Sequence, residues 1–520
     1  MLDRGSRETN ALTVRAARDR LRRVDPLVGV CGVVALTVYV LQGFDGVLTT
    51  ALGVYAYGGQ QVAEGVPPFV AILNRVGPLA HLVPGIGAGV ARLVGVDDIL
   101  GMRVTLMLVS VVAVMVVYLL GRDLFRSRAA GLASAAALLC SEGFLLNATF
   151  GPREKTTMVC FLALALLAMV HQRWGTAGAM IALSTLTWQP VFLPALAGVA
   201  VAAVLGAPGG GRGRLVALSR IAVGGVIPTA ITVLAYAAVG RLQIFLDSFL
   251  LINLRYTTVD GLGTDPGVVW AKMTNGYGWS LWVMILGTLI ILAMGIHAAI
   301  QHTRTTSQGA SLVGLGSFVV VCALWSFKDF DGWMDAFLLL PVAAVGIGGI
   351  VALLAQRVPV RALTAAVVAW CLVATGMAVV TAIGNRSDVL DRQRADGDAV
   401  MAMLPANADI ISVSAPQALV VTRQRNPSRL QMFAMGLDAY VEDTWPGGLR
   451  GYGRWIGTRS PTVIAVGSRG TDPCCPDWLE DVVKQDYQKV GSTPGPFRWF
   501  VNKRISRQTR TEIEAMLDAG

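Results

Sequence analysis

The chain has 520 residues, of which 54% are hydrophobic and only 15% are charged, against about 25% charged in a typical soluble domain. Its mean hydropathy is +0.59. The apolar residues are gathered into runs long enough to cross about 30 Å of hydrocarbon, which excludes a soluble enzyme, a disulfide scaffold, a fibrous protein and a disordered chain. The net charge of +10 reports membrane topology in such a chain, and we expect no nucleic-acid partner.

In chain order, residues 1–26 form a basic arm with seven arginines, which we expect to be cytoplasmic. Residues 27–383 then form a polytopic, mainly α-helical membrane domain of about 11 spans. The predicted spans are 27–44, 103–120, 129–145, 156–171, 175–188, 190–205, 218–239, 280–300, 311–326, 336–355 and 361–383. The fifth and sixth meet at Trp188-Gln189-Pro190 and could instead form one kinked re-entrant pair.

The distribution of charge predicts the orientation of these spans. With a cytoplasmic N-terminus, the inside segments carry a net charge of +12, the external loops before residue 384 carry −3, and the region beyond 383 carries +1. This bias obeys the positive-inside rule. We therefore expect a multi-pass protein of the cell (plasma) membrane whose C-terminal region is extracytoplasmic.

The first external loop, residues 45–102, is unusually long. Tyr55–Ala63 has helical spacing, and Leu79–Val94 is apolar with Gly and Pro interruptions. We expect both to be helices that lie in the membrane interface rather than cross it. Such a platform suits an enzyme that acts on a lipid headgroup.

Three further loops carry candidate binding residues. Arg153 and Lys155 precede the fourth span, where two cations at a helix N-terminus could bind a phosphate; the alternative is interfacial snorkelling with local pairing to Glu154. Asp329 and Asp331 form a D-x-D pair that could hold a divalent cation, or could simply be a solvated turn. The loop with Arg255 has aromatic neighbours typical of an interfacial belt, or of a sugar platform.

Residues 384–520 change character, because charges become frequent. Short apolar strands are predicted at Ile410–Val413, Thr462–Val466 and Phe497–Val501, with helices at Asp396–Leu404 and Asp477–Val483. The pattern predicts a small C-terminal α/β extracytoplasmic domain. No histidine occurs after residue 302, which excludes a Ser-His hydrolase there. Acceptor binding and a structural cap both remain open for this domain.

Several stretches together resemble a known group. The first external loop opens with Asp45 and carries Tyr-x-Tyr-Gly-Gly-Gln-Gln…Glu-Gly-x-Pro-Pro before Gly-Pro-Leu; Asp-Phe-Asp-Gly-Trp-x-Asp-Ala-Phe-Leu-Leu-Leu-Pro follows at 329–341, and Asn-Pro-Ser-Arg through Asp-Thr-Trp-Pro-Gly-Gly at 426–448. This is similar to the GT-C membrane glycosyltransferases that use polyprenyl-phosphate sugars, notably the dolichyl-phosphate-mannose mannosyltransferase-like subgroup. Many relatives have an Asp-Glu pair where this chain has Ala51-Leu52.

The resemblance implies an inverting transferase that moves a mannose-like sugar from a polyprenyl-phosphate donor to a protein, lipid or polysaccharide acceptor on the external face. It implies that Asp45 is the catalytic base. Arg153, Lys155 and Arg255 would stabilise the phosphate, and Tyr57, Gln60, Trp188 and Gln189 would contact sugar or lipid. No cofactor is required, although Asp329 and Asp331 could bind Mg²⁺ or Mn²⁺; the metal site is unknown.

Two other function classes are compatible with the sequence. A lipid or sugar flippase or transporter is disfavoured because charges inside the spans are almost absent and no inverted repeat is visible. A non-catalytic envelope assembly protein is compatible with Ala51-Leu52 in place of the Asp-Glu pair that many relatives have. In each case, membrane lipids surround the protein.

Overall fold

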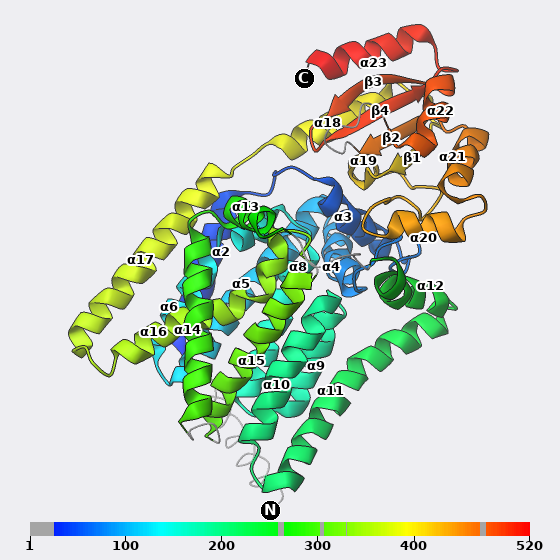
Figure 1. The fold of residues 1–520 in the computed structure, drawn as a ribbon. Coiled ribbons are helices and arrows are strands. Elements are labelled where there is room, and N and C mark those ends of the chain that lie inside the picture. The colour runs from blue at the N-terminus through cyan, green and yellow to red at the C-terminus, as the bar shows by residue number, and fades with distance from the viewer. Residues whose placement is uncertain (1–24, 258–264, 302–305, 329, 468–474, 520) are drawn as a thin grey trace, which may run out of the picture.

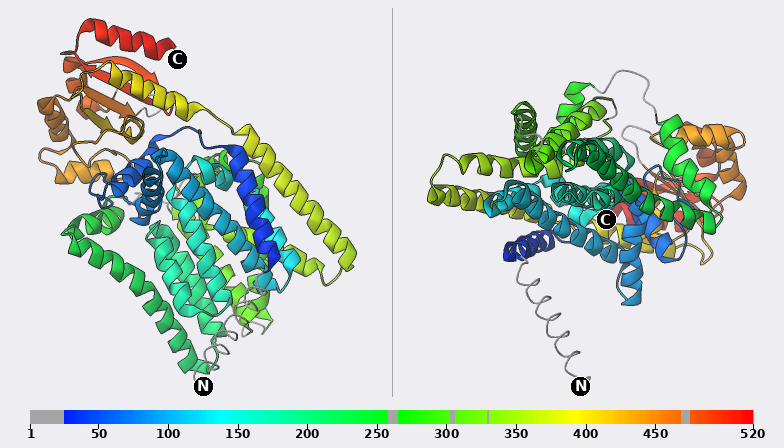
Figure 2. Two further views of the ribbon diagram at one scale, coloured as in Figure 1. Left: turned by 180° about the vertical axis from the view of Figure 1, so that it is seen from behind. Right: turned by 90° about the horizontal axis from the view of Figure 1, so that it is seen from below.

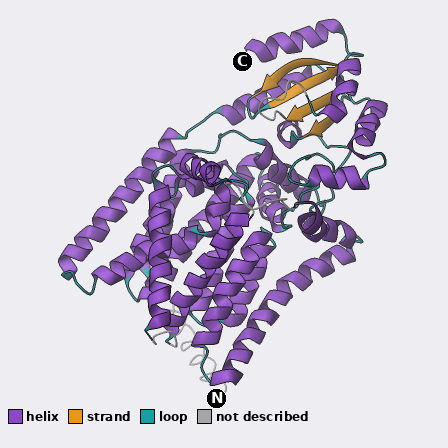
Figure 3. Cartoon of the chain, viewed as in Figure 1, coloured by secondary structure: helices purple, strands orange, loops and turns teal. Residues whose placement is uncertain are grey.

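The computed structural model describes residues 25–257, 265–301, 306–328, 330–467 and 475–519. Most of the basic arm, and Asp329, lie outside these ranges. The described chain is mainly helical and forms a bundle with a small sheet at one end (Figures 1 and 3).

The bundle is built from pairs of adjacent helices (Figure 2). α5 packs against α2, α6 and α8; α9 packs along α11, α10 along α15, α14 along α16, and α17 against α6 and α2. Their bounds are α2 Pro26–Gln42, α5 Asp98–Phe125, α6 Arg128–Leu139, α7 Glu142–Phe150, α8 Glu154–Val170, α9 Trp174–Thr185, η1 Gln189–Val191, α10 Phe192–Gly206, α11 Gly210–Ala238, α14 Ser280–Ile300, α15 Ser307–Lys328, α16 Leu340–Leu354 and α17 Val360–Gly384.

Shorter helices cover the end of the bundle that faces the sheet. Two of them confirm the helices expected in the first loop, α3 and α4. The bounds of this group are α3 Thr50–Ala63, α4 Leu79–Leu93, α12 Leu242–Leu246, η2 Asp247–Tyr256, α13 Pro266–Tyr277 and η4 Trp333–Leu338.

The count of about eleven spans is not reproduced. Six helices among the described residues are long and apolar enough to cross a membrane, or seven if α6 and α7, bent by 66°, form one broken span. α2 and α16 are apolar but shorter. The difference arises where an apolar run does not form one long helix: the expected span 129–145 is divided between α6 and α7, and the run expected at 175–188 holds a helix of only 12 residues, α9.

Glycines allow the closest helix pairs to touch. A Cβ atom at Gly346 would lie 1.9 Å from the carbonyl oxygen of Gly287, and one at Gly287 would lie 2.0 Å from that of Ala343. Backbones of α14 and α16 can approach this closely only where side chains are absent.

The C-terminal region folds around a four-stranded sheet of order β1-β2-β4-β3. β1 and β2 are parallel and the other two pairings are antiparallel. The three predicted strands are present, and β3 was missed. The bounds are α18 Val389–Ala402, β1 Ile410–Val413, α19 Pro416–Thr422, α20 Leu437–Thr444, α21 Gly448–Arg459, β2 Val463–Gly467, α22 Asp477–Asp486, β3 Tyr487–Thr493, β4 Phe497–Asn502 and α23 Arg507–Ala519.

Strand alternation gives this sheet two buried faces. Phe500 packs in the cluster with Tyr452 and α22, whereas its neighbour Trp499 faces the cluster that includes Ile513 of α23. Successive side chains of a strand point to opposite faces, so residues of the single strand β4 pack in both clusters.

The C-terminal region is joined to the first loop by buried hydrogen bonds. The Gln393 amide, fully buried, accepts from the Leu48 N–H at 2.8 Å and donates to the Leu48 carbonyl at 3.0 Å and the Pro494 carbonyl at 2.7 Å. Gln417 donates to the Thr50 hydroxyl at 3.1 Å and the Gly495 carbonyl at 2.8 Å. These contacts fix the sheet above α3.

The close glycine contacts between α14 and α16 predict that a larger side chain at these positions destabilises the protein. We expect Gly346→Val to lower the thermal stability of the detergent-purified protein, since overpacking of this kind costs about 1–3 kcal/mol or more. Gly376→Val is the matched control, because Gly376 lies in a helix with open space around its Cβ position. Equal melting temperatures for the two variants would contradict this packing.

Candidate functional site

The start of α8 leaves its first backbone donors open. Its N-cap residue, Arg153, has extended backbone angles (φ −140°, ψ 132°) and makes no side-chain capping bond. Glu154 lies in the first turn, where a negative charge complements the helix dipole. A helix end with uncapped N–H groups is suited to binding an anion.

The charged side chains at this helix start are almost completely buried. Glu154 is 3% and Lys155 is 7% exposed. Arg153 Nε lies 3.3 Å from Glu154 Oε2, and Lys155 Nζ lies 3.9 Å from Glu154 Oε1. One carboxylate is therefore flanked by two cations.

Lys155 is held by a second carboxylate and an aromatic ring. Its Nζ donates to Asp335 Oδ1 at 2.5 Å and lies 4.4 Å from the centre of the Trp188 ring. The other oxygen of Asp335 accepts from the N–H groups of Asp331 at 2.8 Å and Gly332 at 3.1 Å. The turn before η4 is thus folded around the partner of Lys155.

Three polar atoms near this point are buried without a hydrogen-bond partner among the described residues. They are Arg153 Nε, Glu154 Oε2 and the hydroxyl of Thr156. Arg153 Nε and Glu154 Oε2 lie 3.3 Å apart as an ion pair without hydrogen-bond geometry, so of these three atoms only the Thr156 hydroxyl lies apart from a polar partner, which costs free energy.

Asp45 lies in an irregular segment between α2 and α3 that a buried arginine holds in place. Arg103, 0% exposed, donates from Nε to the Gly151 carbonyl at 3.0 Å and from Nη2 to the Gly46 carbonyl at 2.8 Å, and Nη1 donates to the Phe44 carbonyl. The carbonyls on both sides of Asp45 are therefore tied to the turn that precedes Arg153. The Asp45 side chain is half-buried.

Other predicted residues line the edge of this cluster. Asp331 pairs with Arg75 at 2.7 Å, and Lys272 donates to the Asp331 carbonyl at 2.8 Å. Gln189 donates to the Arg75 carbonyl at 2.8 Å. The structure therefore brings Lys155, Trp188, Gln189 and Asp331 into one connected network.

Three predicted contact residues instead bond to the C-terminal region. The Tyr57 hydroxyl accepts from the Asn426 N–H at 3.0 Å, and Gln60 donates to the Val420 carbonyl at 3.4 Å. Arg255 pairs with Asp443 at 3.3 Å in an exposed position. Their roles toward a substrate stay predictions.

Sequence reasoning missed several members of the network. Arg103 could have been found from the sequence, because it is a charged residue just inside an apolar run. No sequence pattern marks Arg75 or His81. His81 lies on α4, and its ring centre is 5.9 Å from that of Tyr55. Its Nε2 forms a hydrogen bond of 3.3 Å with the side-chain nitrogen of Asn74. Burial lowers the pKa of His81 to about 4, so it is neutral at pH 7.

The D-x-D metal hypothesis is not tested by the described residues. They contain no group of three or more His, Cys, Asp or Glu side chains placed to share an ion. Asp329 lies outside the described ranges, and Asp331 is engaged by Arg75.

Comparison with known proteins finds a family model that matches part of this cluster. Residues 81–236 match the family model described as dolichyl-phosphate-mannose-protein mannosyltransferase. That segment includes α8, its two cations and Trp188. No curated protein matches the sequence.

The fold is similar to solved membrane glycosyltransferases. ArnT from Cupriavidus metallidurans in the apo state is 13% identical over 92% of this chain and 98% of its own, with a TM-score of 0.64; ArnT bound to undecaprenyl phosphate is 14% identical over the same shares, at 0.59. The Archaeoglobus fulgidus oligosaccharyltransferase with Zn and sulfate is 15% identical over 91% and 73%, at 0.51. The expected GT-C resemblance is confirmed.

The buried ion pair predicts a non-additive stability change. Lys155→Met leaves Asp335 without its cation, and we expect a loss of roughly 3–5 kcal/mol. The double variant Lys155→Met/Asp335→Asn should recover part of this loss, since no charge is then stranded. Thermal unfolding of Lys155→Met, Asp335→Asn and the double variant measures the coupling, and strictly additive losses would argue against the pair.

Proposed function

We propose that this chain, which has the GT-C fold, is a membrane glycosyltransferase that takes a sugar from a polyprenyl-phosphate donor. The proposal rests on two cations, Arg153 and Lys155, at the uncapped start of α8. They lie beside the Asp45 segment, which Arg103 holds in place. The ArnT structure with undecaprenyl phosphate, which shares the fold, supports a lipid-phosphate ligand.

In the proposed reaction, an acceptor hydroxyl attacks C1 of the donor sugar and the C1–oxygen bond to the phosphate breaks, with inversion at C1. Asp45 takes the proton of the attacking hydroxyl. Lys155, Arg153 and the N–H groups at the start of α8 stabilise the charge that grows on the leaving phosphate. Trp188 confines Lys155 so that its ammonium group faces the site.

The identity of the sugar, the side of transfer and the acceptor are proposed from the sequence. The sugar is mannose-like, and transfer occurs on the external face, the side that carries the first loop and the C-terminal region. The acceptor is a protein, lipid or polysaccharide. More segments than the six long helices cross the plasma membrane, because α2, α8 and α16 run within the same bundle.

Asp45→Asn tests the proposed base. In vesicles supplied with labelled polyprenyl-phosphate sugars, we expect the variant to lose transfer by about 10²–10⁴-fold while keeping its melting temperature. Asp398→Asn, at an exposed position of α18, is the control that should retain activity. Full transfer by Asp45→Asn would remove Asp45 from the mechanism; sugar movement without a new glycosidic bond would favour a flippase.

The proposal needs no metal, because a monophosphate leaving group can be neutralised by arginine and lysine alone. We expect transfer to persist in the presence of EDTA. Loss of transfer that Mg²⁺ or Mn²⁺ restores would instead assign a metal role to the loop with Asp331.

A further inference from the structure

A polar cavity lies at the seam between the first loop and the C-terminal region, apart from the cations of α8. Its volume is about 410 Å³, within the range of roughly 300–1,000 Å³ typical of small-molecule sites. Seven of its nine lining residues carry polar side chains. They are Gln60, Gln61, Glu64, Arg92, Asp98, Arg423 and Gln424, with Gly95 and Val96 completing the wall.

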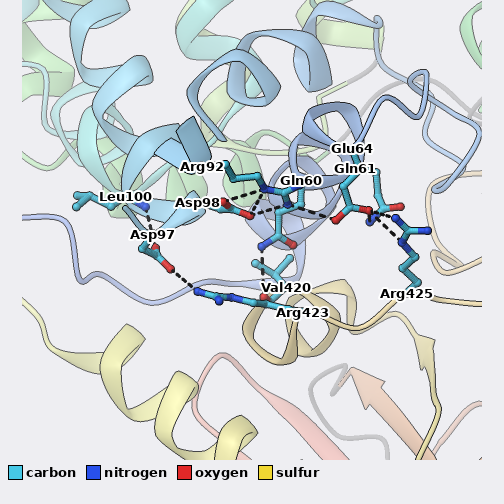
Figure 4. Close-up of polar contacts among 10 residues, drawn as sticks. All are labelled: Gln60, Gln61, Glu64, Arg92, Asp97, Asp98, Leu100, Val420, Arg423 and Arg425. Atoms are coloured by element: carbon cyan, nitrogen blue, oxygen red, sulfur yellow. Dashed lines mark hydrogen bonds and ion pairs between the residues drawn. The ribbon is translucent and has the colours of Figure 1, made fainter. Parts of the chain in front are cut away.

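Ion pairs hold the walls in place (Figure 4). Arg92 reaches Asp98 at 2.7 Å and Glu64 at 3.3 Å, which ties the end of α4 to the start of α5 and the end of α3. Arg425 of the C-terminal region contacts Glu64 at 2.5 Å. The cavity is therefore a built space between α3, α4, the start of α5 and the segment after α19.

The charge of the lining selects the class of occupant. Arg92 and Arg423 are matched by Glu64 and Asp98, so the lining is neutral overall. Arg92 is already bonded to a carboxylate, and unlike the uncapped start of α8, the helix start at this cavity offers no open N-terminus to an anion, because the Asp97 side chain caps α5. An uncharged molecule with many hydroxyl groups can instead donate to these carboxylates and exchange hydrogen bonds with the amides of Gln61 and Gln424.

We propose that this cavity binds an uncharged carbohydrate, which is the glycan part of the acceptor. The acceptor assignment rests on the proposed function, whereas carbohydrate binding does not. α3 connects the two places: Tyr55 lies against Arg153 at 5.8 Å between ring centre and guanidinium, and Gln61 follows six residues later, about 9 Å along the helix.

Binding of free sugars to the full-length protein in detergent tests the proposal. The probes are uncharged methyl hexosides, methyl pentosides and hexose disaccharides, with inorganic phosphate as the anionic comparison, followed by saturation-transfer NMR. We expect saturable binding of at least one neutral glycoside, weakened roughly tenfold by Gln61→Leu and by Gln424→Leu, as for the loss of a well-formed hydrogen bond. Gln485→Leu, at an exposed position of α22, should bind like the parent protein.

The outcomes separate this inference from the proposed function. Failure of every neutral glycoside to saturate, preference for phosphate, or unchanged binding by both cavity variants would overturn the carbohydrate site, even if sugar transfer is observed. Glycoside binding that depends on Gln61 and Gln424 in a protein without transferase activity would keep the site and refute the transferase. Gln424→Leu changes a side chain at the cavity wall outside the helices, so its binding can be read even if Gln61→Leu fails to fold.

Discussion

The arrangement of the site depends on one buried guanidinium. Among the residues that the structure describes, no carboxylate accepts a hydrogen bond from Arg103; its charge is solvated by the main-chain carbonyls of Phe44, Gly46 and Gly151. A buried charge is tolerated only when its donors are satisfied, so these three carbonyls must converge. That requirement joins the end of α2, the wall of α5 and the turn before α8, and it determines where Asp45 and Arg153 lie.

Around this point, charges are buried in compensating pairs instead of being excluded. Glu154 lies between Arg153 and Lys155, and Asp335 organises the turn before η4 while it pairs with Lys155. Such a network costs desolvation and contributes little net stability. Buried ionisable groups in a chain that is otherwise so apolar are consistent with the ligand role proposed for Arg153 and Lys155.

The C-terminal region acts on the first loop through direct contacts. Gln393 pairs with both backbone groups of Leu48, three residues from Asp45, and the Asp45 carbonyl accepts from the Leu390 N–H at 3.0 Å. The segment that carries the proposed base is therefore held from two sides, by Arg103 within the bundle and by α18 above it. In the proposed mechanism, this coupling would let α18 position Asp45.

The sequence by itself determined the membrane class, the helices of the first loop and three of the four strands, because these depend on local composition and periodicity. It did not show where an apolar run is divided into shorter helices, as at α6 and α7, since hydropathy does not register a bend. It could not show that Lys155 lies in the buried charged network whereas Tyr57 bonds to the C-terminal region. Nor could it identify Asp335, 180 residues away, as the partner of Lys155. Only the tertiary structure decided those placements, because burial and ion pairing between distant segments leave no periodic signal in the chain.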